Sequence, residues 1–293
     1  MEEKEVIDVT SLSSSDKAKL AALIREDNLE YVNQNIATVQ VRESFYTKYG
    51  KRFLDILVSS IAIVLTAPIN LVMGFVTFFD VGSPLIFKQQ RIGKDERKFT
   101  IYKFRNMTND RDVNGELLPP NERVTKWGKF VQKTSLDELL NFISIFNGDM
   151  SLVGPRPLLD SYVERFNKRD RQRYAVRPGL ECPPYQHLDH AMTWNEKLDN
   201  DVWYVQNCSL KVDIVLIFRI IQLAFNRKAT AVRSKAGAGG FLGYNRDGSV
   251  ITTQNVPVKY CELFCEKFEY NAIEDAFQDQ KNSKQTEKLK VGV

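Results

Sequence analysis

The stretch Phe53–Phe79, FLDILVSSIAIVLTAPINLVMGFVTFF, decides the fold, because Asp55 is its single charged side chain. As a helix it would be roughly 40 Å long at about 1.5 Å per residue, which exceeds the thickness of a bilayer's hydrocarbon core. Its apolar residues do not gather on one face, so the segment must be buried on all sides, in lipid or in a protein core. The sequence favours lipid.

Pro68 lies near the middle of this stretch, where proline removes a backbone hydrogen bond and usually kinks a helix. Basic residues flank both ends, so charge does not choose which side faces the cytoplasm. They are Arg42, Lys48, Lys51 and Arg52 before the stretch, and Lys88, Arg91, Lys94, Arg97 and Lys98 after it. We therefore predict a re-entrant helix over residues 48–80 that breaks at Pro68 and returns to the same face. A single bent transmembrane helix is the alternative.

Composition narrows the class of protein only modestly. A net charge of +4, from 41 basic and 37 acidic residues in 293, is too small to predict nucleic-acid binding. Sparse cysteines without a cleavable signal peptide predict reduced thiols on the cytoplasmic side. His187 and His190 lie near Cys182, but no second cysteine pair completes a zinc site.

Two short strands are predicted after the apolar stretch, over residues 84–93 and 98–107, joined by a turn that contains Gly93. Alternation places Phe99, Ile101, Lys103 and Arg105 on one face of the second strand. A face that changes from apolar to cationic suits an anion site at the end of the strand. An edge strand protected by charge is the alternative.

The segment Thr134–Pro157, TSLDELLNFISIFNGDMSLVGPRP, sets two acids side by side. Ser135 and Glu138 have the spacing of a capping box, which predicts a helix start that would also attract phosphate. Arg156 lies between Pro155 and Pro157, a rigid setting that suits phosphate or base recognition. An arginine that merely closes a turn is the alternative.

The remaining segments complete the predicted organisation. Residues 1–47 form a polar extension with a helix that begins near position 15, residues 108–123 form a loop, and residues 158–176 form a helix. An apolar helix over residues 211–226 is too short to span a bilayer and is predicted to lie along its surface. Residues 81–230 form the catalytic domain, and residues 231–293 form an extension whose charged end is expected to be disordered.

Taken in order, the motifs YKFRNM, TSLDEL, NGDMSLVGPRP, VRPG and WYVQNCSLKVDI resemble those of the bacterial sugar transferase family, specifically its small monotopic polyprenol-phosphate phosphoglycosyl transferases. The resemblance covers residues 48–225. It implies transfer of a phosphosugar from a UDP-sugar to undecaprenyl phosphate, with release of UMP, on the cytoplasmic face of the bacterial inner membrane. This reaction begins the assembly of a glycan.

By the same resemblance, Asp137 and Glu138 are the catalytic dyad. Asp137 would form a covalent aspartyl-phosphosugar, and both acids would lie at a Mg²⁺ ion. Substrate binding would fall to the other matched positions, which are Lys103, Arg105, Pro155, Arg156, Pro157 and Asp201. A carboxylate nucleophile that divides one difficult step into two, with cations that stabilise the developing charge, agrees with this assignment.

Gln132 stands where many relatives carry arginine, and Asp189 stands where some small relatives carry one. Ala67 stands where the family has serine before the helix-breaking proline. The divergent loop at residues 181–193 leaves one alternative, a membrane-anchored protein that binds nucleotide sugars or acts as a scaffold without turnover. A phosphohydrolase that uses the same aspartyl chemistry with water as acceptor is a second alternative. The predicted fold is α+β, rich in helices with a few short strands. The sequence does not name the sugar or the pathway, and it leaves a homo-oligomer open.

Overall fold

The computed structural model describes residues 6–113, 115–186, 188, 190–225 and 239–268. The described part is helix-rich with short strands, which agrees with the predicted α+β class. Its helices are α1 (Ser14–Asn35), η1 (Tyr46–Gly50), α2 (Lys51–Val81), η2 (Lys94–Glu96), α3 (Pro120–Arg123), α4 (Lys126–Thr134), η3 (Leu136–Glu138), α5 (Asn141–Asn147), η4 (Asp160–Arg165), η5 (Asp170–Ala175), α6 (Trp194–Asn207), α7 (Leu210–Phe225) and α9 (Val258–Phe268). Its strands are β1 (Val6–Ile7), β2 (Ile86–Ile92), β3 (Lys98–Phe104), β4 (Ser151–Val153), β5 (Gly179–Glu181), β6 (Phe241–Tyr244), β7 (Val250–Thr252) and β8 (Val256–Pro257).

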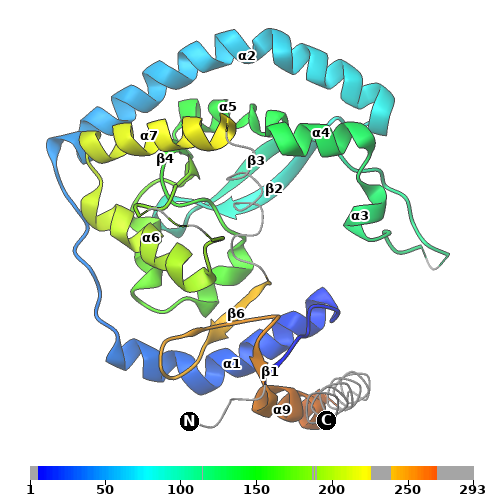
Figure 1. Cartoon of the computed structure of the whole chain (residues 1–293), viewed down its shortest axis with the longest axis vertical. Helices are drawn as coiled ribbons and strands as arrows, with labels where there is room; N and C mark the ends of the chain where they lie inside the picture. The colour runs from blue at the N-terminus through cyan, green and yellow to red at the C-terminus, as the bar shows by residue number, and fades with distance from the viewer. Residues whose placement is uncertain (1–5, 114, 187, 189, 226–238, 269–293) are drawn as a thin grey trace, which may run out of the picture.

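The molecule is arranged in layers (Figure 1). The long helix α2 arches over one end, α4, α5 and α7 lie beneath it, and the hairpin β2–β3 and helix α6 follow. Helix α1, strand β6 and helix α9 form the opposite end. The predicted site motifs therefore lie between the long apolar helix and a layer built from both terminal regions.

Helix α2 is long and apolar enough to cross a membrane, and little of its apolar stretch is buried inside the protein. Large side chains along it, such as Val64, Leu71 and Phe75, are mostly exposed. The predicted break at Pro68 is wrong, since α2 continues through Pro68 as one curved helix. Thr66 Oγ1 donates to the Ala62 carbonyl one turn earlier, so a side chain supports the backbone next to the proline.

Both ends of α2 form hydrogen bonds with the helices beneath it. At its start, Arg52 donates to the carbonyls of Ile145 (2.6 Å) and Phe146 (2.7 Å) at the end of α5. At its end, Asp80 accepts a 2.6 Å hydrogen bond from Thr125, the N-cap of α4. The middle of the helix is therefore the part that is left uncovered.

The acid pair does not lie at a capped helix start. Ser135 has φ +56° and ends α4 in the left-handed region, and its side chain makes no capping bond. The predicted capping box at Ser135 is therefore wrong, and Asp137 and Glu138 lie in the short 3-10 helix η3 between α4 and α5. The physical reason is the turn itself, because a tight connection between two helices needs a residue with positive φ there.

Two other predicted helices have different outcomes. The helix near position 15 is confirmed as α1, whose N-cap Ser13 accepts from the Asp16 amide. The predicted helix over residues 158–176 is wrong, since the chain there forms the 3-10 helices η4 and η5, separated by residues 166–169. Asn167 Oδ1 accepts from the amides of Arg169 and Asp170, a local bond that competes with a continuous helix.

The two terminal regions form one layer, which we call the terminal layer and define as residues 6–35 and 239–268. Strand β1 pairs with β8, and α1 packs against β6 and α9. Ile24, Leu242 and Phe264 meet in its apolar core. The predicted extensions at the two ends of the chain thus pack together, and the tail beyond 268 lies outside the described residues.

Candidate active site

Strand β3 brings Lys103 to the acid pair. In the antiparallel hairpin β2–β3, Phe87 pairs with Lys103. Phe99 and Ile101 pack in a small core with Ile145 and Met150, so alternation brings Lys103 to the same face one step further on. Its Nζ lies 2.6 Å from Glu138 Oε1. The prediction that the side chains on this face change from apolar, at Phe99 and Ile101, to cationic, at Lys103, is therefore confirmed.

Arg156 approaches Glu138 from another direction. Its Nη2 lies 2.5 Å from Glu138 Oε1, and its Nη1 lies 3.4 Å from Glu181 Oε2 on β5. The parallel pair β4–β5 places this arginine, with Ser151 opposite Gly179 and Val153 opposite Glu181. Just after β4, the backbone of Gly154 lies close to Gly179. A Cβ on Gly179 would collide with the backbone of Gly154.

The two acids have different surroundings. Glu138 accepts from Lys103 and Arg156, whereas Asp137 has a 3.4 Å hydrogen bond from Asn106 Nδ2. Burial raises the pKa of Asp137, with Lys103 opposing the shift and Glu138 adding to it. Burial would also raise the pKa of Glu138, but the charges of Arg156 and Lys103 outweigh it, so that pKa is lowered. One carboxylate is thus neutralised by cations while its neighbour is not.

Other predicted site residues lie further from the dyad. Arg105 donates to the carbonyls of Pro84 and Met107, so it braces the end of the hairpin. Asp201 is 2 % exposed and forms an ion pair with Arg173, with 2.8 Å between Oδ2 and Nη2. Among the described residues, Asp201 does not line the cavity beside Glu138.

Pro155 and Pro157 flank Arg156 on the loop that leaves β4, and Pro157 lines a small cavity of about 30 Å³ beside Glu138. Such a volume holds a water molecule, not a nucleotide sugar. Arg91 and Asn141 also line it, and Arg91 Nε and Asn141 Oδ1 are buried without a partner. Sequence reasoning missed both residues as site residues. The signal for Arg91 was its place in the basic cluster before Lys103.

The departures from the family pattern lie apart from these contacts or outside the described residues. Gln132 has an exposed side chain on α4. Asp189 is outside the described residues.

The two histidines do not form a metal site in the described structure. His187 is outside the described residues, and His190 Nε2 lies 2.9 Å from Glu196 Oε1. Within the described part of the chain, no three His, Cys, Asp or Glu side chains gather in a way that would hold a metal by themselves.

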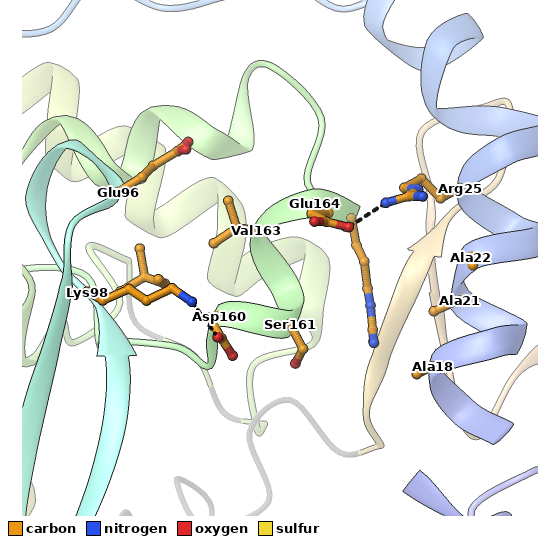
Figure 2. A pocket seen from close by; sticks show the side chains of 12 residues that line it. Ala18, Ala21, Ala22, Arg25, Glu96, Lys98, Asp160, Ser161, Val163 and Glu164 are labelled. Carbon is orange, nitrogen blue, oxygen red and sulfur yellow. Dashed lines mark hydrogen bonds and ion pairs between the residues drawn. The ribbon is translucent and has the colours of Figure 1, made fainter. Parts of the chain in front are cut away.

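A larger cavity, of about 560 Å³, lies elsewhere, between α1 and the segment that contains η4 (Figure 2). Ala18, Ala21 and Ala22 form its wall on α1. Each carboxylate that lines it is paired with a cation: Glu164 with Arg25, Asp160 with Lys98 and Glu96 with Arg171. Its size suits a ligand, but its carboxylates are all paired, whereas Asp137 of the dyad has no ion pair among the described residues. The dyad is therefore the better candidate for chemistry.

Known proteins show which family has this arrangement. The family model described as bacterial sugar transferase matches residues 46–227 of the chain. The chain belongs to the bacterial sugar transferase family. All the site residues named above fall inside the matched range, whereas the terminal layer lies outside it.

Three relatives in this family illustrate the similarity. The chain is 39 % identical over 167 residues to the uncharacterized sugar transferase EpsL of Bacillus subtilis (strain 168), covering 57 % of this chain and 83 % of that protein. It is 34 % identical over 180 residues to the UDP-N-acetylgalactosamine-undecaprenyl-phosphate N-acetylgalactosaminephosphotransferase of Aeromonas hydrophila, covering 59 % of this chain and 43 % of that protein. It is 34 % identical over 190 residues to the UDP-glucose:undecaprenyl-phosphate glucose-1-phosphate transferase of Klebsiella pneumoniae, covering 61 % and 41 % respectively. The chain thus spans less than half the length of the two relatives with named reactions.

Proposed function

We propose that this sugar transferase moves a phosphosugar from a UDP-sugar to undecaprenyl phosphate and releases UMP. The observation that carries the proposal is the shared contact of Lys103 and Arg156 with Glu138, directly beside the less strongly bound Asp137. Two cations at one carboxylate give a site that can accept a diphosphate. The relatives named for this reaction support the same substrates.

In the proposed reaction, a carboxylate oxygen of Asp137 attacks the phosphorus that carries the sugar. The bond from that phosphorus to the bridging oxygen breaks, and UMP leaves with the electron pair. An oxygen of undecaprenyl phosphate then attacks the same phosphorus, which frees Asp137 and forms the lipid diphosphosugar. Lys103 and Arg156 would stabilise the charge that develops on the phosphate oxygens.

The dyad suits a Mg²⁺ ion, which proteins usually hold through one or two carboxylates together with substrate phosphates and water. Asp137 and Glu138 supply two carboxylates, so they would be its protein ligands. The ion would neutralise the negative charge that the diphosphate brings beside these acids. Because the cavity by Glu138 is small, we infer that the nucleotide sugar lies over its opening rather than inside it.

We further propose that α2 is re-entrant and places the site on the cytoplasmic face of the bacterial inner membrane. Its two ends are fastened to the same body, at Ile145 and Thr125. Apolar side chains are also exposed on the three helices beneath α2, as at Phe130 on α4, Phe146 on α5 and Phe218 on α7. These helices would lie in the lipid interface, where the phosphate of the lipid acceptor is found.

The test is UMP release by detergent-purified protein given Mg²⁺, undecaprenyl phosphate and a panel of UDP-sugars. The parent should release UMP only with the lipid, and Asp137→Asn should lower the rate by more than about 1000-fold. UDP-N-acetylgalactosamine, UDP-galactose and UDP-glucose belong in the panel. Release of free sugar phosphate without lipid product would favour the phosphohydrolase, and UDP-sugar binding without turnover would favour the scaffold.

A further inference from the structure

Strand β6 lies outside the family-matched residues 46–227 and yet helps to build the core next to the candidate site. Phe241 is fully buried and Tyr244 is 2 % exposed. Both pack in one cluster with Phe166, Tyr174 and Trp194 of the matched region. The terminal layer therefore contributes to the interior of the catalytic domain and does not merely rest on its surface.

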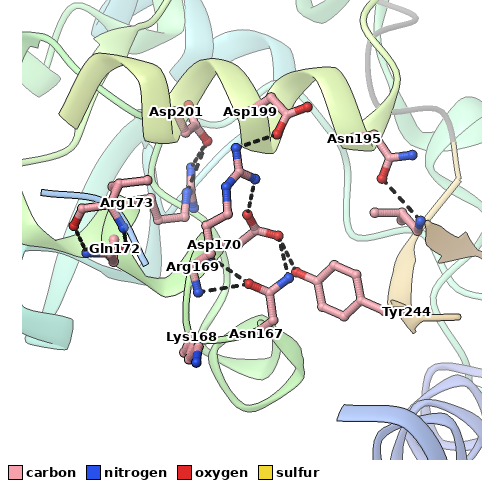
Figure 3. Close-up of polar contacts among 12 residues, drawn as sticks. Asn167, Lys168, Arg169, Asp170, Gln172, Arg173, Asn195, Asp199, Asp201 and Tyr244 are labelled. Carbon is pink, nitrogen blue, oxygen red and sulfur yellow. Dashed lines mark hydrogen bonds and ion pairs between the residues drawn. The ribbon is translucent and has the colours of Figure 1, made fainter. Parts of the chain in front are cut away.

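A buried polar contact accompanies this packing (Figure 3). The hydroxyl of Tyr244 donates a 2.7 Å hydrogen bond to Asp170 Oδ2 at the start of η5. Asn167 donates to the same oxygen at 2.9 Å, and Arg169 lies 3.1 Å from Asp170 Oδ1. Because Asp170 is buried, each of these partners contributes to holding the start of η5 in place.

Arg173 carries the connection from η5 toward the site. A 3-10 helix has three residues per turn, so Asp170 and Arg173 lie one above the other on the same side of η5. The Arg173 side chain is 1 % exposed and donates from Nε (3.0 Å) and Nη2 (2.8 Å) to Asp201 Oδ2. Its Nη2 also donates a 2.8 Å hydrogen bond to the main-chain carbonyl of Arg156.

The hydrogen bond to that carbonyl restricts a main chain that two prolines already constrain on either side of Arg156. The ring of Pro157 restricts the backbone of the residue before it, and Pro155 has a fixed φ. Once Arg173 holds the carbonyl, the main chain at Arg156 has little freedom left. The direction from which its guanidinium reaches Glu138 is then set by η5.

We propose that β6 is a positioning element of the active site. Tyr244 fixes Asp170, the η5 helix fixes Arg173, and Arg173 fixes the main chain that aims Arg156 at Glu138. The consequence for the reaction rests on the function proposed above, but the mechanical connection does not. A segment outside the family-matched region thus sets the geometry of a phosphate-binding arginine.

The test uses the full-length protein with Tyr244→Phe, which removes the hydroxyl and keeps the buried ring. We expect a folded protein whose kcat/KM for the UDP-sugar falls about 2- to 10-fold, the effect of one buried hydrogen bond. Ser13→Ala is the control, because it removes one hydrogen bond within the terminal layer, from the Asp16 amide to the Ser13 hydroxyl, at the far end of α1 from Asn28, which contacts Tyr244. That variant should keep the kcat/KM of the parent. Equal losses in the two variants would overturn the proposal.

A double-mutant cycle separates positioning from general destabilisation. If Tyr244 acts through Arg156, Tyr244→Phe should have little further effect on kcat/KM in an Arg156→Lys background. Full additivity of the two losses would contradict the proposed connection.

A readout that needs no turnover keeps this inference separate from the proposed function. In protein with ¹⁵N-labelled arginine, the Nε signal of Arg156, assigned with Arg156→Lys, should shift in Tyr244→Phe and stay in place in Ser13→Ala. A shifted signal in a protein without transferase activity would support the positioning element and reject the proposed reaction. An unchanged signal would reject the positioning element whatever the activity.

Discussion

Arg156 Nη2 lies 2.5 Å from Glu138 Oε1, and Lys103 Nζ lies 2.6 Å from the same oxygen. One carboxylate oxygen thus receives two cations, one from strand β3 and one from the loop after β4. Its neighbour Asp137 has no comparable ion pair among the described residues, although the two acids are adjacent in sequence. This asymmetry is the basis of the proposed roles, and the predictions below test its consequences.

Glu138→Gln should separate binding from turnover. The change removes the negative charge that Lys103 and Arg156 neutralise, so the phosphates of a UDP-sugar should bind at least as tightly as before. It also removes a proposed Mg²⁺ ligand, which should lower kcat by about 100-fold or more. Calorimetry with a UDP-sugar and the rate of UMP release measure the two effects. Glu181→Gln, which removes the longer 3.4 Å partner of Arg156, is the control and should have a much smaller effect on kcat.

The pH profile should report the raised pKa of Asp137. A nucleophilic carboxylate must be ionised, so activity should be lost as the pH falls through the pKa of Asp137, above the ordinary value of 3.8. Glu138, whose pKa is lowered, stays ionised in this range. The charge of Lys103 lowers the pKa of Asp137, so Lys103→Met should move the acid limb of kcat/KM to higher pH. Lys88→Met, on the neighbouring strand, should leave the limb in place; a limb that moves equally in both would contradict the assignment.

Asp201→Asn should mainly destabilise the protein. The change leaves Arg173 buried without its countercharge, which costs about 3 kcal/mol when one partner of a buried pair is lost. Thermal or denaturant unfolding in detergent measures the loss. Asp199→Asn is the control in the same helix. The Asp199 carboxylate that pairs with Arg169 is exposed, so losing this pair should lower the free energy of unfolding by less than about 1 kcal/mol. Similar stabilities of the two variants would argue against a structural role for Asp201.

The proposed topology of α2 predicts how its ends react from the two sides of the membrane. The experiment uses a Cys265→Ser background, in which the three remaining cysteines are buried. In this background, Lys48→Cys and Lys88→Cys should both resist an impermeant maleimide in intact spheroplasts and react with it after lysis. Val64→Cys, at an exposed apolar position in mid-helix, should resist in both conditions because it lies in hydrocarbon. Labelling of one end in intact spheroplasts would show a spanning helix.

Removal of divalent metal should abolish UMP release by the parent, since the diphosphate would then meet two acids without a neutralising ion. EDTA should stop the reaction and excess Mg²⁺ should restore it. In Glu138→Gln, restoration of any residual rate should need more Mg²⁺ than in the parent. Unchanged release in EDTA would remove the metal from the proposed mechanism.

The sequence by itself determined the elements whose signals are local. The apolar run Phe53–Phe79 has helix length and no polar face, and it forms most of α2. Alternation along Phe99, Ile101 and Lys103 predicted a strand whose apolar end packs inward and whose cationic end faces the acids. These predictions succeeded because periodicity and composition act over a few residues and survive in almost any packing.

Only the tertiary structure decided which side chains meet. Ser135 matched a capping box, but the tight turn between α4 and α5 placed it in the left-handed region instead. Residues 158–176 have helix-forming composition, yet Asn167 and the buried contacts of Asp170 and Arg173 hold two 3-10 turns there. The approach of Arg156 and Lys103 to one oxygen, and of Tyr244 to Asp170, joins residues 18, 35 and 74 positions apart. No local pattern encodes such distances, because they depend on how the whole chain buries its apolar surface.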